Sequence, residues 1–166
     1  MTVARITLRP GHEISRVIRG GWQLAGGHGA VDRAEAIKDM VAFADAGITT
    51  FDCADIYTGV EEMIGAFRTE YRNQRGVEAL ARIKVHTKLV PDLSRLATVD
   101  RAYIRGIVET SIRRLQAERL DLVQFHWWDY SVPRYLDVVC WMDELRREGL
   151  IANVSATNFD SAKTAE

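Results

Sequence analysis

The sequence is poor in features that anchor or cross-link a chain: it has two cysteines, three prolines and no long apolar run. Cys53 and Cys140 are far apart and form no C-x-x-C pair, so we expect no disulfide framework and a reducing, cytoplasmic location. No apolar stretch approaches the ~20 residues of a membrane-spanning helix. The N-terminus MTVARITLRPGHEISR lacks the apolar segment of a secretory signal. A formal net charge of -1 gives no reason to expect nucleic acid or an anionic membrane as a partner.

What the sequence does contain is an alternation of strand-like and helix-like segments over 166 residues, with 47% hydrophobic and 27% charged residues. These values are typical of a globular protein and predict a single domain, 1–166, with its own core. Residues 1–17 are predicted to form a small N-terminal hairpin that turns at Pro10-Gly11. Strands are predicted within residues 17–24, 48–52, 83–90, 121–128 and 150–159. Helices are predicted between them, beginning at Asp32, Glu61 and Asp100 and near Pro133, with Asp32 and Glu35 placed as a capping-box-like pair.

This alternation of five strands and four helices fits two architectures. One is a complete, doubly wound parallel sheet. The other is the first part of an eight-stranded (β/α)8 barrel, whose usual length is ~250 residues. The C-terminal stretch NFDSAKTAE indicates a strand end followed by barely one helical turn, which is not stable alone. This ending favours an α/β fold of the TIM-barrel type that is truncated after the fifth strand.

In both architectures, functional residues gather at the carboxyl ends of the parallel strands. Taken singly, the polar residues predicted there have simpler structural interpretations. A lysine before a proline turn is usually solvated, a histidine beside tryptophans usually belongs to the core, and Asp55 suits a turn. The two cysteines are expected to be small buried residues. Glu61 and Glu62 are expected to stabilise a helix N-terminus.

Taken together, Asp52, Tyr57, Lys88 and His126 form a chemically sensible set. A lysine ammonium favours the ionised form of a nearby tyrosine, and an aspartate keeps that lysine charged and in place. A histidine across the pocket can donate a hydrogen bond to a carbonyl oxygen. Such a set could protonate an alkoxide as a hydride arrives at carbon.

Two other kinds of site are not predicted. The glycine-rich stretch GGWQLAGGHG matches neither G-x-G-x-x-G nor G-x-x-x-x-G-K-[ST], so no phosphate cradle is expected there. No H-E-x-x-H motif or Cys/His ligand spacing occurs, so no metal is expected.

Four segments, in the same order along the chain, resemble those of the aldo-keto reductase family. FDCADIYTGVEEMIG resembles the segment in which an aspartate precedes the catalytic tyrosine by five residues, and HTKLV resembles the third-strand T-K element. DLVQFHWW resembles the fourth-strand histidine followed by tryptophan, and GLIANVSATNF resembles the family's G-K-I-R-x-x-G-V-S-N-F stretch. The matching segments span residues 20–159.

The resemblance implies an NAD(P)H-dependent oxidoreductase that reduces an aldehyde or ketone by direct hydride transfer. Tyr57 would be the general acid, Lys88 would favour its ionised form, Asp52 would support Lys88, and His126 would orient the carbonyl. The cofactor would be NADP(H), less often NAD(H). The resemblance implies that it is bound by Gly21, Trp22, Asp52, Thr157 and Asn158, with Asn158 on the nicotinamide carboxamide. Trp22 and Trp127 would line the substrate pocket.

The sequence departs from the family pattern in several places. Thr58-Gly59 follows Tyr57 where Gly-Asn is common, and Thr157 replaces a serine. Lys84 and His86 share strand parity with Lys88 and would face the barrel interior, either as a polar layer or as an irregular strand start. A five-stranded arc would leave two edges unpaired and an apolar inner face open. We therefore expect self-association and no stable cofactor-binding monomer from 166 residues alone.

Two other functions remain open on the sequence. One is a non-catalytic relative, such as a redox-sensing or channel-associated subunit, that binds the cofactor without efficient turnover. The other is a complete flavodoxin-like binding module, for which the strand order would be 2-1-3-4-5.

Overall fold

The structure, a computed structural model, describes residues 3–27 and 29–165. Residues 1–2 of the predicted hairpin segment and residue 166 lie outside the described residues. Two short antiparallel strands come first, followed by a five-stranded parallel sheet with helices between its strands. The sheet strands are β3 (Ile18–Gly20), β4 (Thr50–Asp52), β5 (Lys84–Leu89), β6 (Leu122–Phe125) and β7 (Val154–Ala156). The helices are η1 (Trp22–Ala25), α1 (Arg33–Asp45), α2 (Val60–Arg75), α3 (Val77–Ala81), η2 (Leu93–Arg95), α4 (Arg101–Arg114), α5 (Tyr135–Arg147) and α6 (Ser161–Ala165).

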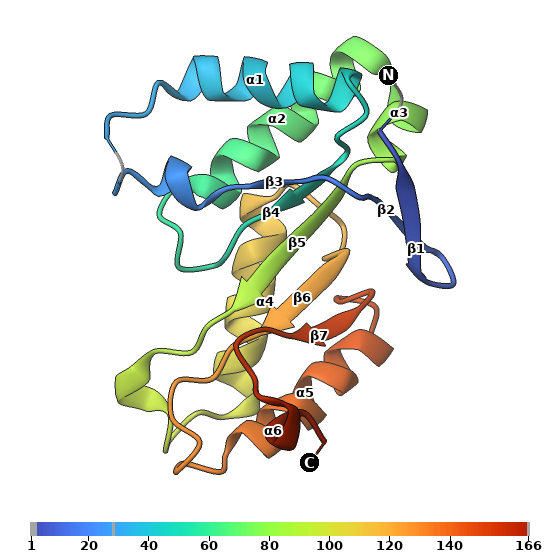
Figure 1. The fold of residues 1–166 in the computed structure, drawn as a ribbon. Coiled ribbons are helices and arrows are strands. Elements are labelled where there is room, and N and C mark those ends of the chain that lie inside the picture. The colour runs from blue at the N-terminus through green and yellow to red at the C-terminus, as the bar shows by residue number, and fades with distance from the viewer. Residues whose placement is uncertain (1–2, 28, 166) are drawn as a thin grey trace.

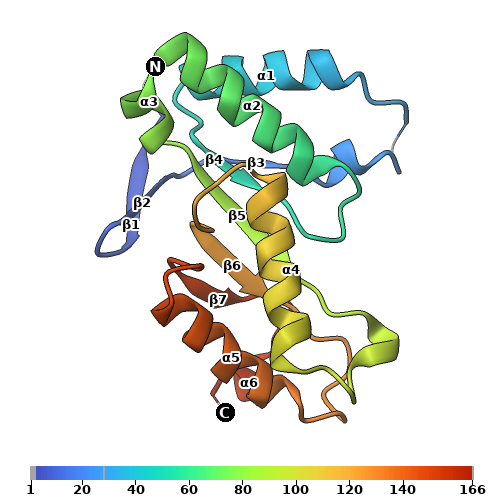
Figure 2. The same ribbon diagram turned by 180° about the vertical axis from the view of Figure 1, so that it is seen from behind.

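The order of strands in the sheet identifies the architecture. The order is β3-β4-β5-β6-β7, so each strand pairs in parallel with the next one along the chain. A flavodoxin-like sheet would have the first two strands exchanged, so that alternative is wrong. In Figure 2, α2, α4 and α5 lie in front of the strands, on one face of the sheet. Sequential parallel strands with helices on one face are the arrangement of a (β/α)8 barrel, here as an arc of five strands.

The N-terminal hairpin forms where the sequence predicts it. Strands β1 (Arg5–Arg9) and β2 (His12–Ser15) pair in antiparallel fashion around Pro10-Gly11. The hairpin lies beside the amino ends of β5 and β6 (Figure 1). Ser15 joins it to the sheet, because its backbone N–H donates to Thr50 Oγ1 at 3.0 Å. The hairpin therefore covers the end of the strands that is opposite to their carboxyl ends.

The helix starts follow from their capping residues. The Asp32 carboxylate accepts hydrogen bonds from the backbone N–H groups of Ala34 and Glu35, which stabilises the start of α1 by about 1 kcal/mol. Glu35 does not return a bond to Asp32 but pairs with Lys38 at 2.6 Å, so only half of the predicted capping box forms. Asp100 caps α4 in the same way through the N–H of Tyr103.

The second predicted helix is longer than expected and is followed by an unexpected one. α2 continues to Arg75 rather than ending near Tyr71, and Gly76, with a φ of 87°, separates it from α3. The last turn of α2 and all of α3 lack the apolar periodicity on which the prediction depended, since most of their side chains are solvated.

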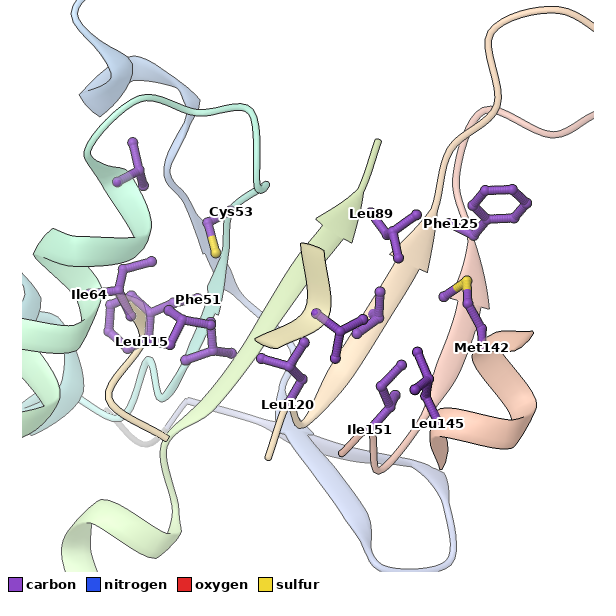
Figure 3. Packing of buried hydrophobic residues seen from close by; sticks show 14 of the residues in the cluster. Phe51, Cys53, Ile64, Leu89, Leu115, Leu120, Phe125, Met142, Leu145 and Ile151 are labelled. Atoms are coloured by element: carbon purple, nitrogen blue, oxygen red, sulfur yellow. The ribbon is translucent and has the colours of Figure 1, made fainter. Parts of the chain in front are cut away.

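The apolar core fills the space between the sheet and its helices. Phe51, Leu89 and Phe125 point from the strands toward Ile64, Leu115 and Met142 on the helix side (Figure 3). Each fully buried side chain of this size contributes about 1.5–3 kcal/mol. α2 and α4 approach each other so closely that a Cβ on Gly65 would lie 2.1 Å from the backbone oxygen of Arg114. Cys53 belongs to this core, as expected, whereas Cys140 is exposed on α5, so its predicted burial is wrong.

The other face of the sheet is polar, which corrects the expectation of an apolar inner face. Because side chains alternate along a strand, the residues between the core-facing ones point away from the helices. On β4, β5 and β6 these are Thr50, Asp52, Lys84, His86, Lys88, Leu122 and Gln124. An apolar inner surface therefore gives no reason for self-association. β3 and β7 are the edge strands of the sheet, and association through them stays a prediction.

Candidate active site

An ion pair links the carboxyl ends of β4 and β5. Lys88 Nζ lies 2.6 Å from Asp52 Oδ1 and donates a second hydrogen bond to the backbone oxygen of Cys53 at 2.9 Å. The second carboxylate oxygen of Asp52 accepts from Gln124 Nε2 at 2.7 Å. The Lys88 and Asp52 side chains are only 16% and 29% exposed, so each charge is compensated by hydrogen bonds as well as by its partner.

Tyr57 lies beside this ion pair. It follows β4 in the loop that leads to α2, where its backbone N–H donates to the oxygen of Ala54 at 3.1 Å. Lys88 Nζ is 5.1 Å from the centroid of the half-buried Tyr57 ring. The structure thus brings three of the sequence-predicted residues, Asp52, Lys88 and Tyr57, into one cluster.

His126 forms a second cluster with Asn158 at the ends of β6 and β7. The distance between His126 Nδ1 and Asn158 Nδ2 is 3.2 Å. With the Asn158 amide nitrogen as the donor, Nδ1 is the acceptor and the proton of the neutral ring is on Nε2. Burial lowers the pKa of His126, which favours the neutral ring. Its Nε2 atom is buried and has no hydrogen-bond partner among the described residues.

Within residues 3–27 and 29–165, no side-chain hydrogen bond or ion pair joins these two clusters, although both lie at the carboxyl ends of neighbouring strands. A buried N–H without an acceptor costs about 1–3 kcal/mol. That unpaired donor gives the end of β6 a place for a ligand oxygen, as a carbonyl would provide.

The two predicted tryptophans beyond the strands have different surroundings. Trp127 is 2% exposed, and its Nε1 donates to the backbone oxygens of Asp129 and Val132 at 2.9 and 3.0 Å. Its position in the core does not support the prediction that it lines a substrate pocket. Trp128, which the sequence did not single out, is 48% exposed and meets the His126 ring edge-on, with centroids 4.4 Å apart.

The first strand ends at a glycine that the packing requires. Gly21 N–H donates to the backbone oxygen of Asp52 at 2.8 Å. A Cβ on Gly21 would lie 2.8 Å from that oxygen and 2.8 Å from Val60 Cγ1. The absence of a side chain therefore lets β3 approach the end of β4. The next residue, Trp22, begins η1 and is 59% exposed.

The last strand places Thr157 and Asn158 beside His126. The Thr157 N–H donates to the oxygen of Phe125 at 2.9 Å, which continues the pairing of β6 with β7. Asn158 has a φ of 62°, and its backbone oxygen accepts from the Tyr130 hydroxyl at 3.0 Å. The exposed Asn158 amide is thus held at the strand end by its backbone.

Gln124 is a site residue that the sequence reading missed. It is the polar residue within the apolar run LVQF, and its parallel register partner is Lys88. That register, which the sequence alone does not fix, is what brings the amide to Asp52. Residues 3–27 and 29–165 contain no group of three or more His, Cys, Asp or Glu side chains that could hold a metal ion. No helix in this part of the chain is both long and apolar enough to cross a membrane.

The comparisons with known proteins identify the family of the chain. Residues 16–166 match the model of the aldo/keto reductase family, and the chain belongs to that family. It is 32% identical to the aldo-keto reductase YhdN of Bacillus subtilis over 152 residues, which are 90% of this chain and 45% of the relative. It is 25% identical to the methylglyoxal reductase DkgA of Escherichia coli O157:H7, over 93% of this chain and 49% of the relative. The chain thus spans about half the length of these curated relatives.

Solved structures support the same fold. A Pseudomonas aeruginosa protein, described as a candidate aldo-keto reductase, superposes with a TM-score of 0.72 at 27% identity, over 92% of this chain and 59% of that one. A Bombyx mori aldo-keto reductase in complex with NADP gives a TM-score of 0.79 at 20% identity, over 99% of this chain and 53% of that one. The arc of five strands therefore corresponds to part of a TIM-type barrel.

Proposed function

We propose that the protein carrying this chain reduces an aldehyde or ketone with a nicotinamide cofactor, and that Tyr57 is the general acid. The observation that carries the proposal is the position of Lys88. Its Nζ lies 2.6 Å from Asp52 Oδ1 and 5.1 Å from the centroid of the Tyr57 ring. An ammonium beside a phenol favours the phenolate, so this arrangement prepares Tyr57 to give up its hydroxyl proton.

The proton movements follow from these positions. Carbonyl reduction adds a hydride to the carbonyl carbon and a proton to the carbonyl oxygen. Tyr57 Oη supplies the proton, and Lys88 stabilises the tyrosinate that remains until solvent reprotonates it. His126 Nε2–H donates a hydrogen bond to the same carbonyl oxygen and so orients the substrate. Trp128, at the edge of the His126 ring, replaces Trp127 as the proposed aromatic wall beside the substrate, together with Trp22.

The residues present fit the nicotinamide end of the cofactor that the family implies. A carboxamide needs both a donor and an acceptor, and the exposed Asn158 amide offers both beside His126. When bound, the cofactor supplies the hydride. We propose Asn158 as the partner of the carboxamide and keep Gly21, Trp22, Asp52 and Thr157 as further contacts. NADP(H) remains the first expectation and NAD(H) the second.

Turnover separates this proposal from the second candidate, a sensor or regulatory subunit that binds the cofactor without efficient reduction. The protein carrying this chain is mixed with NADPH or NADH and with methylglyoxal or 4-nitrobenzaldehyde, and loss of absorbance at the nicotinamide band is followed. Methylglyoxal is included because a relative is named for its reduction. Substrate-dependent oxidation of either cofactor supports the enzyme. Cofactor binding with no oxidation by either aldehyde favours the sensor and overturns the proposal.

The proposed partner is a small carbonyl compound, with no nucleic acid or membrane. Cys53 and Cys140 are both free thiols, which suits a reducing compartment, and we propose the cytoplasm. Association of the 166-residue chain through its β3 and β7 edges is proposed as well. Size-exclusion chromatography tests it: a monodisperse monomer at micromolar concentration contradicts association.

A further inference from the structure

Asp55 lies in a turn, as the sequence predicts, and it is also tied to β5. The pairing of β4 with β5 continues past the end of β4, because Cys53 N–H donates to the oxygen of His86 and Asp55 N–H donates to the oxygen of Lys88 at 3.2 Å. The next rung uses a side chain: Asp55 Oδ2 accepts from the backbone N–H of Val90 at 3.2 Å. Asp55 therefore holds β5 on both sides of Leu89.

A third contact fixes the same residue from the helix layer. Arg114, at the end of α4, donates to the backbone oxygen of Asp55 at 3.1 Å. Arg114 also pairs with the fully buried Glu61 at 3.4 Å and with Glu62 at 3.1 Å. Glu61 in turn accepts from Thr87 Oγ1 at 2.7 Å, which ties the start of α2 to β5. The loop after β4, strand β5 and helices α2 and α4 are thus linked around Asp55, which lies two residues before Tyr57.

The Asp55 carboxyl is poorly solvated. Its second oxygen, Oδ1, is buried and has no hydrogen-bond partner among residues 3–27 and 29–165. On its outer side the residue lines a cavity of about 340 Å³ with Tyr103, Ile107 and Arg114. The charged groups that face it are Glu61 on α2 and Arg114 on α4. Burial, and to a lesser extent Glu61, raise the pKa of Asp55 to about 7.

Asp55 and Asp52 differ in the groups to which they form hydrogen bonds. Asp52 uses both oxygens on side chains of the site, Lys88 and Gln124. Asp55 uses its backbone N–H and one oxygen on the backbone of β5, at Lys88 and Val90. Asp52 therefore holds the Lys88 side chain, whereas Asp55 holds the loop after β4 against the backbone of β5.

We propose that Asp55 is a positioning residue that holds the Tyr57 loop against β5, and so sets the distance between the Tyr57 ring and the Lys88 ammonium. The inference rests on the proposed function, since the distance between Tyr57 and Lys88 affects the rate only where Tyr57 is the general acid. A small misplacement of reacting groups lowers a rate strongly, whereas cofactor contacts on other strands are unaffected.

Two variants of the protein carrying this chain test the proposal. Asp55→Ala removes the acceptor of the buried Val90 N–H, and Asp55→Asn keeps an acceptor oxygen while removing the charge. We expect Asp55→Ala to lower kcat by about tenfold or more with NADPH affinity within about twofold of the wild type. We expect Asp55→Asn to restore most of kcat, because its side-chain oxygen still accepts from the Val90 N–H. Asp39→Asn, on the exposed face of α1, is the matched control and keeps the wild-type kcat.

Failure of this inference can be distinguished from failure of the proposed function. Wild-type kcat in Asp55→Ala overturns the positioning role, as does a loss of kcat in Asp55→Asn as large as that in Asp55→Ala. If Asp55→Ala fails to fold, Asp55→Asn decides alone: a loss of kcat of about tenfold in that variant overturns the positioning role. Tyr57→Phe is measured alongside: full activity of that variant refutes the proposed function, whereas its inactivity with unaffected Asp55 variants refutes only the inference.

Discussion

Two neighbouring side chains on the inner face of β5 form pairs of opposite character. At the carboxyl end, Lys88 forms a charged pair with Asp52 at 2.6 Å. Two residues earlier, in the middle of the strand, His86 Nε2 lies 3.0 Å from His12 Nε2 of the hairpin, with the ring centroids 5.2 Å apart. One imidazole donates and the other accepts, so the histidine pair is neutral. A single strand thus carries a charged pair at its carboxyl end and an uncharged pair nearer the hairpin.

Solvation explains the difference. His12 and His86 are 3% and 6% exposed, and burial lowers the pKa of both, that of His86 to about 4. The charge of the Lys88 ammonium is offset by a carboxylate and a backbone oxygen at the carboxyl edge of the sheet. The hairpin therefore forms a neutral histidine pair with the middle of β5, while the carboxyl end of the strand holds an ion pair. This contrast also answers the question left open about His86: it belongs to a polar layer and not to an irregular strand start.

The largest expected effect comes from removing the charge at the carboxyl end. Lys88→Met should lower kcat by about a hundredfold or more, because Tyr57 loses the ammonium that stabilises its ionised form. It also leaves Asp52 without a counter-ion. The matched control is Lys84→Met, at the amino end of the same strand, where the ammonium donates only to the Ala81 oxygen. Steady-state kinetics should show the loss in the first variant alone; equal losses would contradict a role specific to Lys88.

The second prediction concerns how the His12–His86 pair changes the free energy of unfolding at acid pH. The folded-state pKa of His86 lies below its usual 6.5, so its contribution to stability is present above about pH 6.5 and is lost as the pH falls toward 4. That loss amounts to about 3 kcal/mol. Replacing the pair by His12→Gln with His86→Gln should flatten this dependence. Urea unfolding at pH 7.0, 5.5 and 4.5 measures it, and parallel curves for the two proteins would contradict the assignment.

A smaller effect distinguishes the two tryptophans after β6. Trp127→Phe should cost about 2 kcal/mol of unfolding free energy, because it removes a buried indole and both of its hydrogen bonds. Trp128→Phe should change stability by no more than about 0.5 kcal/mol and should raise KM for the carbonyl substrate. Denaturant unfolding and substrate saturation curves check the pair. The reverse assignment of the two effects would restore Trp127 as the pocket residue.

The sequence predicted the strands and helices that carry the site better than it predicted the contacts of their side chains. Period-two and helical patterns located every sheet strand, and Asp32 and Asp100 marked two helix starts correctly. Placing Asp52 and Lys88 at the same edge of the sheet required only the rule that parallel strands share one carboxyl edge. That their strands are neighbours follows from the barrel order, which the resemblance implied and the structure shows.

What the sequence could not supply was register and the direction of side chains outside the strands. Gln124 contacts Asp52 through the pairing of β6 with β5, and composition does not encode that pairing. β6 ends at Phe125, so strand alternation no longer decides whether Trp127 or Trp128 faces the site. Asp55 was predicted correctly as a turn residue, but its neighbours in the sequence do not indicate its contact with Arg114, which is distant in the sequence and adjacent in space.

The most direct test of the account is the rate of hydride transfer in Tyr57→Phe, measured in a single turnover with NADPH bound. The central claim is that Tyr57 protonates the carbonyl oxygen while Lys88 and Asp52 only prepare it to do so. We expect NADPH affinity within about twofold of the wild type and a transfer rate lowered by about a thousandfold. A wild-type transfer rate in this variant would contradict the claim and remove Tyr57 from the chemistry.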